Sequence, residues 1–122
     1  MANKDDMLAA PQKYLTAFQV QDLEGILALY AGDAVVEDPV GSDKHVGIDA
    51  IRAFYSGAMG AKVEAELTGP VRLAGQEAAF PFTITVVGAN LAIDIIDVFR
   101  FNDDGKVVEM RAFWGDTNHR ST

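Results

Sequence analysis

The stretch Leu91–Phe101, LAIDIIDVFRF, decides the fold of this chain. Taken as a β-strand, it directs successive side chains to opposite faces of a sheet. Asp97 then lies on a face that is otherwise apolar, whereas Asp94 and Arg100 share the opposite face, which tolerates water. A buried carboxylate without a partner costs several kcal/mol on the usual scales. Asp97 therefore requires either an ion-pair partner or a chemical reason to be there.

Other segments after residue 60 also alternate with a period of two, which is typical of half-buried strands. They are AKVEAEL at 61–67, AAFPFTITVV at 78–87 and KVVEMRAFW at 106–114. The last of these is expected to place Val108, Met110, Ala112 and Trp114 on one face. The segments GAN at 88–90 and NDDG at 102–105 have the composition of turns. The second half of the chain is therefore predicted to form an antiparallel sheet.

The first half shows apolar residues at helical spacing instead. Tyr14 and Phe18 mark a first helix, which we expect to begin near Pro11 or to kink before it. Proline lacks a backbone N–H and its ring clashes with the preceding helical turn. Asp22 is a favourable N-cap for a second helix, which Gly32 is able to end.

A short strand, AVVED at 34–38, and a third helix from residue 48 complete the first half. Helices followed by an antiparallel sheet are typical of the α+β class. A curved sheet over three N-terminal helices would enclose an apolar pocket. We expect one domain over residues 1–122, a length that supports one hydrophobic core.

The overall composition excludes several classes of function. The formal net charge is −8, which disfavours binding to nucleic acid or to an anionic membrane. The chain has no cysteine, so thiol catalysis and thiolate metal sites are excluded. The N-terminal segment MANKDDML is too polar for a signal peptide, and no apolar run is long enough to cross a bilayer. We expect a soluble cytoplasmic protein.

Tyr14, Asp38 and Asp97 are polar residues at positions where apolar ones are expected. Each has a structural explanation: a core tyrosine with its hydroxyl at the surface, a turn residue at a strand end, and a carboxylate paired with an arginine such as Arg111. They also fit a chemical role. Burial raises the pKa of a carboxyl group, and the neutral acid is a hydrogen-bond donor.

Two such donors, the hydroxyl of Tyr14 and the carboxyl of Asp97, would stabilise an oxyanion in a dry cavity. Asp38, at a strand end near solvent, is the better candidate for an ionised general base. Together the three residues suggest the enolisation of a ketone.

The chain resembles the Δ5-3-ketosteroid isomerases, which belong to the NTF2-like (SnoaL-like) superfamily of cone-shaped α+β proteins, over nearly its full length. The similar segments are KYLTAF (13–18), DAVVEDPVG (33–41), GIDAIRAFY (47–55), LTGPVR (67–72), IIDVFRF (95–101) and RAFWG (111–115). The family is itself a standard example of a neutral carboxylic acid at an active site, so the inference about Asp97 and the resemblance are not independent.

The resemblance implies a role for each polar residue. Asp38 would take a proton from C4 of a 3-oxo-Δ5-steroid and return it to C6. Tyr14 and protonated Asp97 would donate hydrogen bonds to the dienolate oxygen at C3. Tyr55 would donate to the hydroxyl of Tyr14, and Tyr30 to that of Tyr55.

The resemblance also implies the walls of the pocket and the assembly. Trp114 would lie beside Asp38, and the walls for a flat apolar steroid would include Phe54, Phe82, Phe99 and Met110. No cofactor and no metal would be needed, and the protein would form a homodimer through the outer face of its curved, mixed but mostly antiparallel sheet. The turn at 88–90 is short for the family and would alter the rim of the pocket or the dimer face.

Other functions of the same fold stay open, because fold alone does not determine function. Epoxide hydrolases of this shape use an Asp–Arg–Asp set, for which Arg111 would supply the arginine. Dehydratases use histidine with aspartate, and the only histidines are His45 and His119. Polyketide cyclases use a single acid such as Asp38. A binding module without catalytic activity is expected to lose at least one of the three polar residues, and all three are present.

Overall fold

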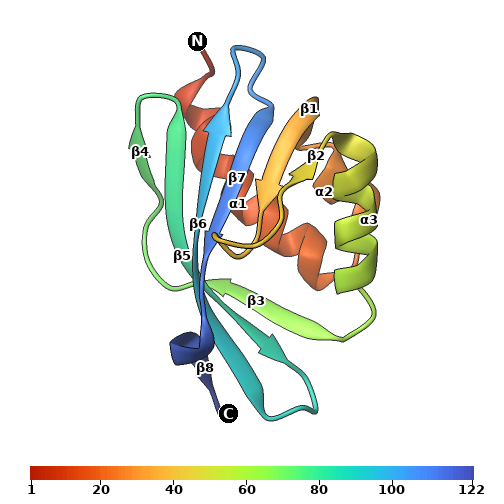
Figure 1. Cartoon of the computed structure of the whole chain (residues 1–122). Coiled ribbons are helices and arrows are strands. Elements are labelled where there is room, and N and C mark those ends of the chain that lie inside the picture. The colour runs from red at the N-terminus through yellow and green to blue at the C-terminus, as the bar shows by residue number, and fades with distance from the viewer.

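The computed structural model describes residues 1–122 and shows three helices packed against one curved sheet (Figure 1). The elements in chain order are α1 (Lys4–Gln19), α2 (Leu23–Leu27), β1 (Tyr30–Glu37), β2 (His45–Val46), α3 (Ile48–Ala58), β3 (Val63–Leu67), β4 (Arg72–Ala74), β5 (Glu77–Val86), β6 (Leu91–Phe101), β7 (Val107–Phe113), the 3-10 helix η1 (Asp116–Asn118) and β8 (His119–Arg120). No helix combines the length and hydropathy needed to span a bilayer.

The sheet has eight strands, and its main path runs β2-β1-β7-β6-β5-β3. Strand β4 pairs with β5, and β8 pairs with β6. Only β1 and β7 are parallel, and every other pair is antiparallel. The predicted α+β fold, with three N-terminal helices on a mixed, mostly antiparallel sheet, is confirmed.

Helix α1 is longer than predicted and contains Pro11 in its interior. It begins at Lys4, because the side chain of Asn3 caps it by accepting hydrogen bonds from the backbone N–H groups of Asp5 and Asp6. The expectation that the helix begins near Pro11 is therefore wrong. Pro11 is buried within the helix, and Tyr14 is also buried, three residues further along.

Helix α2 begins as predicted, since the side chain of Asp22 accepts a hydrogen bond of 3.0 Å from the N–H of Gly25. The helix ends at Leu27, however, and Gly32 lies inside strand β1. The prediction that Gly32 ends this helix is wrong, because parallel pairing with β7 already starts at Tyr30. That pairing is a long-range contact which local helical spacing does not reveal.

Strand β6 lies at the centre of the sheet and has the predicted alternation. Asp97 and Phe99 are buried, whereas Asp94 and Arg100 are exposed. Asp97 is opposite Phe80 on β5 and opposite Ala112 on β7. Because β6 is paired on both sides at this point, its register holds the carboxyl group of Asp97 on the inner face of the sheet.

The prediction of which residues of β7 face the core is wrong at Val108. The pairing of β6 with β7 shifts between Arg100 and Phe101, so that one extra residue is accommodated in β7. Val107 and Met110 are consequently both fully buried, and Val108 is only partly buried. The expected grouping of Val108 with Met110 is therefore wrong at its first member.

An aromatic cluster joins α1 to the sheet beneath Asp97. The ring of Phe99 packs edge-on against Tyr14 at 5.3 Å and against Phe80 at 5.0 Å between ring centroids. Phe99 has no exposed surface. These contacts hold the helix that carries Tyr14 at a defined distance from the strand that carries Asp97.

Replacing Phe99 with alanine is expected to lower the free energy of unfolding by about 3–5 kcal/mol, the usual range for removing a buried phenylalanine. Urea denaturation measures this change. Val46, whose side chain is 65% exposed, provides the control, and Val46→Ala is expected to change stability by no more than about 0.5 kcal/mol. Equal effects of the two substitutions would contradict the assigned core.

Candidate active site

A cavity of about 320 Å³ lies between the helices and the inner face of the sheet. Of the 15 residues that line it, 13 are hydrophobic, and the other two are Asp38 and Asp97. It is an apolar pocket with a few converging polar groups, the usual form of a small-molecule site.

Most of the residues predicted for the site meet in this cavity. The lining includes Tyr14, Asp38, Phe54, Tyr55, Phe82, Asp97 and Trp114. Tyr30, Phe99 and Met110 lie in the hydrophobic core instead of the wall. Phe99 packs under Tyr14, Met110 is opposite Phe99 on β7, and Tyr30 reaches the site only through Tyr55.

Eight lining residues were not predicted from the sequence. They are Phe18, Ala58, Ala61, Val63, Ile84, Val86, Ile93 and Ile95. The signal for half of them was present, because Ile93 and Ile95 alternate in register with Asp97, and Ile84 and Val86 alternate in register with Phe82. The two alanines carry no such signal, since they lie at the end of α3 and in the loop after it.

The carboxyl group of Asp97 is the least expected group in the cavity. The residue is 1% exposed, and neither carboxyl oxygen has a hydrogen-bond partner in the protein. Burial raises the pKa of Asp97 well above its ordinary value, and the negative charge of Asp38 raises it further. The neutral acid is therefore favoured, and its O–H is free to donate into the cavity.

Three tyrosines form a buried chain of hydrogen bonds. The hydroxyl oxygens of Tyr14 and Tyr55 are 3.0 Å apart, and those of Tyr30 and Tyr55 are 2.7 Å apart. Each hydroxyl has one proton to donate. If Tyr30 donates to Tyr55 and Tyr55 donates to Tyr14, the proton of Tyr14 is left for a group in the cavity.

Burial raises the pKa of all three tyrosines well above the ordinary value for a phenol. The hydrogen bond with Tyr55 opposes this effect on the pKa of Tyr14. The phenol form is favoured throughout, so Tyr14 remains a donor at neutral pH.

Asp38 has a different environment. It follows directly after β1 and is only partly buried. Burial raises the pKa of Asp38, while a hydrogen bond from Trp114 and the nearby His45 lower it. The indole Nε1 of Trp114 donates to Oδ1 of Asp38 at 2.7 Å. This hydrogen bond stabilises the ionised form and orients the carboxylate.

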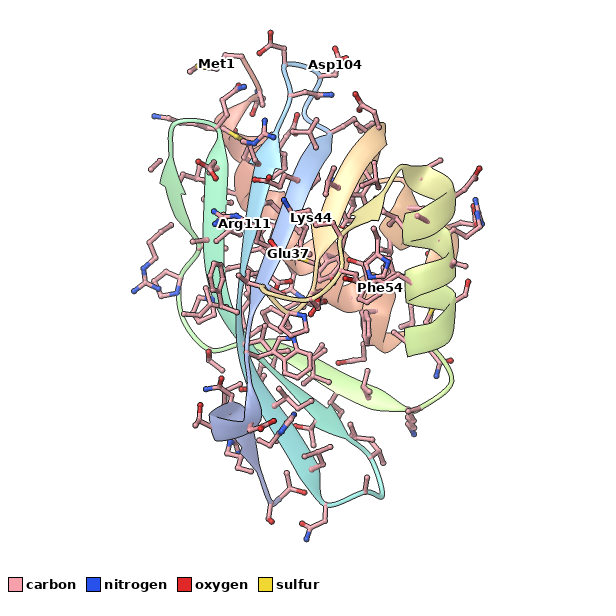
Figure 2. All side chains as sticks on the ribbon, in the orientation of Figure 1. Met1, Glu37, Lys44, Phe54, Asp104 and Arg111 are labelled. Carbon is pink, nitrogen blue, oxygen red and sulfur yellow. The ribbon has the colours of Figure 1, made fainter.

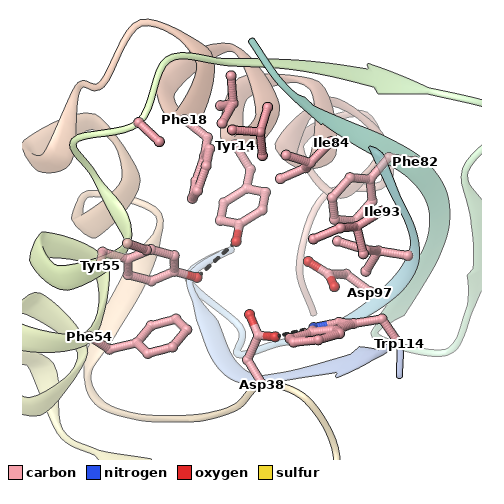
Figure 3. Close-up of a pocket in the computed structure, with 15 residues that line it drawn as sticks. Tyr14, Phe18, Asp38, Phe54, Tyr55, Phe82, Ile84, Ile93, Asp97 and Trp114 are labelled. Carbon is pink, nitrogen blue, oxygen red and sulfur yellow. Dashed lines mark hydrogen bonds between the residues drawn. The ribbon is translucent and has the colours of Figure 1, made fainter. Parts of the chain in front are cut away.

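Figure 3 shows the hydroxyl of Tyr14 and the carboxyl groups of Asp38 and Asp97 entering the cavity from three different sides. The three come from α1, from the end of β1 and from the middle of β6. Two carboxyl groups in unequal environments, one favoured as the neutral acid, are typical of paired acid and base roles. The arrangement is suited to moving a proton next to an oxygen that develops negative charge.

The basic residues required by two alternative functions lie outside the cavity. Arg111 (Figure 2) forms ion pairs with acidic residues of β5 and β7. Its guanidinium lies 5.6 Å from the ring centroid of the exposed Phe113. His45 packs at 4.5 Å against Phe54, and His119 is exposed on β8. None of the three basic residues lines the cavity, and no cluster of acidic residues or histidines in the structure could hold a metal ion.

An α+β cone whose apolar pocket contains two carboxyl groups and a buried phenol belongs to the NTF2-like class of small-molecule domains. The chain is a member of the SnoaL-like domain family, whose model matches residues 12–110. It is similar to "Steroid Delta-isomerase" from Nocardioides simplex, with 42% identity over 111 residues that cover 89% of each chain. The resemblance to ketosteroid isomerases is thereby confirmed.

Two further relatives are described by epoxide chemistry. The chain is 32% identical over 114 residues to "Epoxide hydrolase LasB" from Streptomyces lasalocidi, of which it spans 40%. The chain also superposes on the solved structure of SalBIII, an epoxide hydrolase/cyclase-like enzyme of pyran ring formation in salinomycin. The TM-score is 0.89 at 25% sequence identity, and the superposition covers 100% of each chain. The same fold thus occurs among relatives with different reactions.

The buried acid makes stability depend on pH in a definite direction. Because the pKa of Asp97 is raised in the folded state, the unfolded chain loses this proton first, above about pH 4, and folding must take the proton up again. Wild-type protein should therefore lose stability relative to Asp97→Asn as the pH rises from about 4 toward the raised pKa. Urea denaturation of both proteins from pH 4 to 8 measures the difference.

Asp94 provides the matched control on the same strand. Hydrogen bonds from Arg120 and Thr83 lower the pKa of Asp94, so its contribution is present above the unfolded pKa and lost as the pH falls. Asp94→Asn should therefore have a nearly constant effect on stability above about pH 5 that diminishes only in stronger acid, whereas the effect of Asp97→Asn changes above about pH 4. Parallel pH dependences for the two variants would refute the burial of a neutral acid at position 97.

Proposed function

We propose that this protein is a steroid Δ-isomerase, which converts a 3-oxo-Δ5-steroid into the conjugated Δ4 isomer. The observation that carries the proposal is the unpartnered carboxyl group of Asp97, buried beside the phenol of Tyr14 and across the apolar cavity from Asp38. The similarity to a steroid Δ-isomerase over 89% of both chains supports it.

In the first step the carboxylate of Asp38 takes a proton from C4 of the substrate. The electron pair of that C–H bond forms the C3–C4 double bond, and the carbonyl π pair moves onto the oxygen at C3. The product of this step is a dienolate. In the second step the pair on oxygen re-forms the carbonyl, the C3–C4 π pair moves to form the C4–C5 double bond, and the C5–C6 π pair takes the proton from Asp38 to form the C6–H bond. No other reactant is consumed.

The developing oxyanion accepts hydrogen bonds from Tyr14 and from the neutral acid of Asp97. Donors that are already oriented in a dry cavity stabilise such a charge more than water does, and removing one typically lowers the rate by about 10²–10³-fold. Tyr55 and Tyr30 position the hydroxyl of Tyr14 through their hydrogen bonds. The apolar walls raise the pKa of Asp97 and so keep it a donor.

A second candidate is the opening or cyclisation of an apolar epoxide. It is supported by the similarity to LasB and SalBIII. Here Asp97 or Tyr14 gives its proton to the epoxide oxygen as the C–O bond breaks, while Asp38 takes the proton of the attacking hydroxyl, whose oxygen bonds to the carbon. The position of Arg111 outside the cavity disfavours an Asp–Arg–Asp set, so this candidate ranks second. Two further alternatives stay open. SnoaL-like polyketide cyclisation would need only one acid, such as Asp38. A non-catalytic module would bind an apolar ligand without converting it.

We also propose that two copies associate through the outer face of the sheet, as the isomerase family does. Ile96 and Phe113 are paired across β6 and β7 on this face and are 48% and 41% exposed. Exposed apolar side chains in contact with one another favour such an interface.

The decisive assay follows the conjugated enone by ultraviolet absorbance with 5-androstene-3,17-dione as substrate. Wild-type protein is expected to produce the signal, and Asp38→Asn to lower kcat by at least about 10²–10⁴-fold, the usual contribution of a general base. The amide is nearly isosteric, so calorimetry should show that Asp38→Asn still binds the phenolic steroid estradiol.

Folded wild-type protein without turnover of this steroid would overturn the proposal. Turnover of an apolar epoxide that depends on Asp38 would then favour the second candidate. Binding without either activity would favour a non-catalytic module.

The hydrogen bond from Trp114 should appear in the pH dependence of catalysis. Trp114→Phe removes a donor that lowers the pKa of Asp38, so the pKa rises and less base is ionised in mild acid. The acid limb of kcat/KM, which reports the free enzyme, should move to higher pH. Asp94→Asn, outside the cavity, should leave the limb unchanged. An unshifted limb in Trp114→Phe would show that the indole does not tune the base.

A further inference from the structure

The cavity is polar at one end only. The polar groups of its lining belong to Tyr14, Tyr55, Asp38, Asp97 and Trp114, whose indole N–H donates to Asp38. Asp97 pairs with Phe80, and the hairpin of β5 and β6 then continues through Phe82 with Ile95 and through Ile84 with Ile93 toward the turn at 88–90. At about 3.3 Å per residue, the strand from Asp97 to Ile93 spans roughly 13 Å.

The remote end of the cavity is entirely aliphatic. It is lined by Ala58, Ala61, Val63, Ile84, Val86 and Ile93. Val63 and Val86 face each other in the pairing of β3 with β5, so they belong to the same end as Ile84 and Ile93. No lining side chain at this end can donate or accept a hydrogen bond.

The aliphatic end is also the open end. At the polar end Asp97, Tyr14 and Tyr55 are at most 4% exposed and Asp38 is partly buried, whereas Ala58 and Ala61 are exposed to solvent. A Cβ atom placed on Gly57 or Gly60 would meet nothing within 4 Å. In the rim between the end of α3 and the start of β3, four of the six residues at 57–62 are therefore Gly or Ala with free space beside the two glycines, while Met59 packs against the core and Lys62 is exposed.

We propose that the preferred substrates are 3-ketosteroids whose C17 carries no polar group, and that a long hydrocarbon side chain at C17 leaves the pocket past Ala58 and Ala61. This inference rests on the proposed isomerase function, since the polar end is taken to hold the C3 oxygen. The nucleus then extends along β6, and C17 lies inside the rim, among the buried Val63 and the half-buried Ile84 and Ile93, where water is displaced.

The physical reason is a difference in solvation. A 17-oxo or 17-hydroxyl group at this end gives up hydrogen bonds to water and finds no polar side chain in return. A hydrocarbon chain in the same place buries apolar surface, worth about 25 cal/mol per Å² removed from water. The pocket should therefore favour apolar C17 substituents over polar ones.

Binding tests the inference independently of turnover. Trp114 is the only tryptophan and lines the cavity, so its fluorescence reports occupancy. Three Δ4 ketones share the polar end and differ at C17: androst-4-en-3-one, 4-androstene-3,17-dione and 4-cholesten-3-one. At one fixed cyclodextrin concentration, the first and third are expected to bind at least about threefold more tightly than the 17-oxo compound. Tighter binding of the 17-oxo compound, or exclusion of 4-cholesten-3-one, would overturn the inference.

A substitution at the rim separates the exit path from general affinity. Ala61→Phe should weaken binding of 4-cholesten-3-one by about tenfold or more and change that of androst-4-en-3-one by less than about twofold. Ala53→Phe provides the matched control, because Ala53 is exposed on α3 outside the lining, and it should change neither. An unchanged affinity for 4-cholesten-3-one in a folded Ala61→Phe protein would refute the exit at this rim.

The same experiment distinguishes the two proposals. Turnover of 5-androstene-3,17-dione with the opposite order of affinities would overturn the C17 preference and leave the isomerase function standing. The expected order of affinities without any turnover would overturn the isomerase function and leave the apolar rim as a property of binding.

Discussion

The burial of one carboxyl group without a partner is the constraint on which the rest of this structure depends. Asp97 is held inside by strands paired on both sides of β6, so it cannot turn to solvent without breaking the register of the sheet. Its surroundings raise its pKa and thereby favour the neutral acid. The carboxyl group faces an apolar cavity, and neither of its oxygens has a hydrogen-bond partner in the protein.

The two carboxyl groups of the cavity differ through their positions in the fold. Asp97 lies in the middle of a central strand, and Asp38 lies just after the end of β1, where it is less buried and where Trp114 can donate to it. The chain of three tyrosines reaches the same cavity from the opposite side. Two carboxyl groups in unequal environments and a phenol in one apolar space suit several reactions that create charge on oxygen, and the relatives are named for isomerisation and for epoxide chemistry.

Much of this could be predicted from local patterns. Alternation in Leu91–Phe101 correctly separated Asp97 from Asp94, because a strand with one buried face permits only one register. Capping by Asp22 was equally local. The wrong predictions have two causes: pairing between strands that are far apart in the chain, and competition between local signals within α1. Gly32 lies in β1 instead of ending a helix, because that strand pairs with β7. The register shift between β6 and β7 places Val107, and not Val108, in the core. Helix α1 begins at Lys4 and not near Pro11, because the side chain of Asn3 caps it there and the helix packs on the sheet.

The sequence by itself determined the fold class and the polar residues that do not fit an ordinary core, because periodicity and residue chemistry are local properties. The family was indicated by the resemblance of several segments to ketosteroid isomerases. Only the tertiary structure decided which of those residues share a cavity. It placed Arg111 and both histidines outside the lining, moved Phe99 and Met110 into the core, and brought Ala58 and Ala61 to an open aliphatic rim. Depth and accessibility arise from how helices and sheet curve around a common space, and that arrangement depends on contacts between residues far apart in the chain.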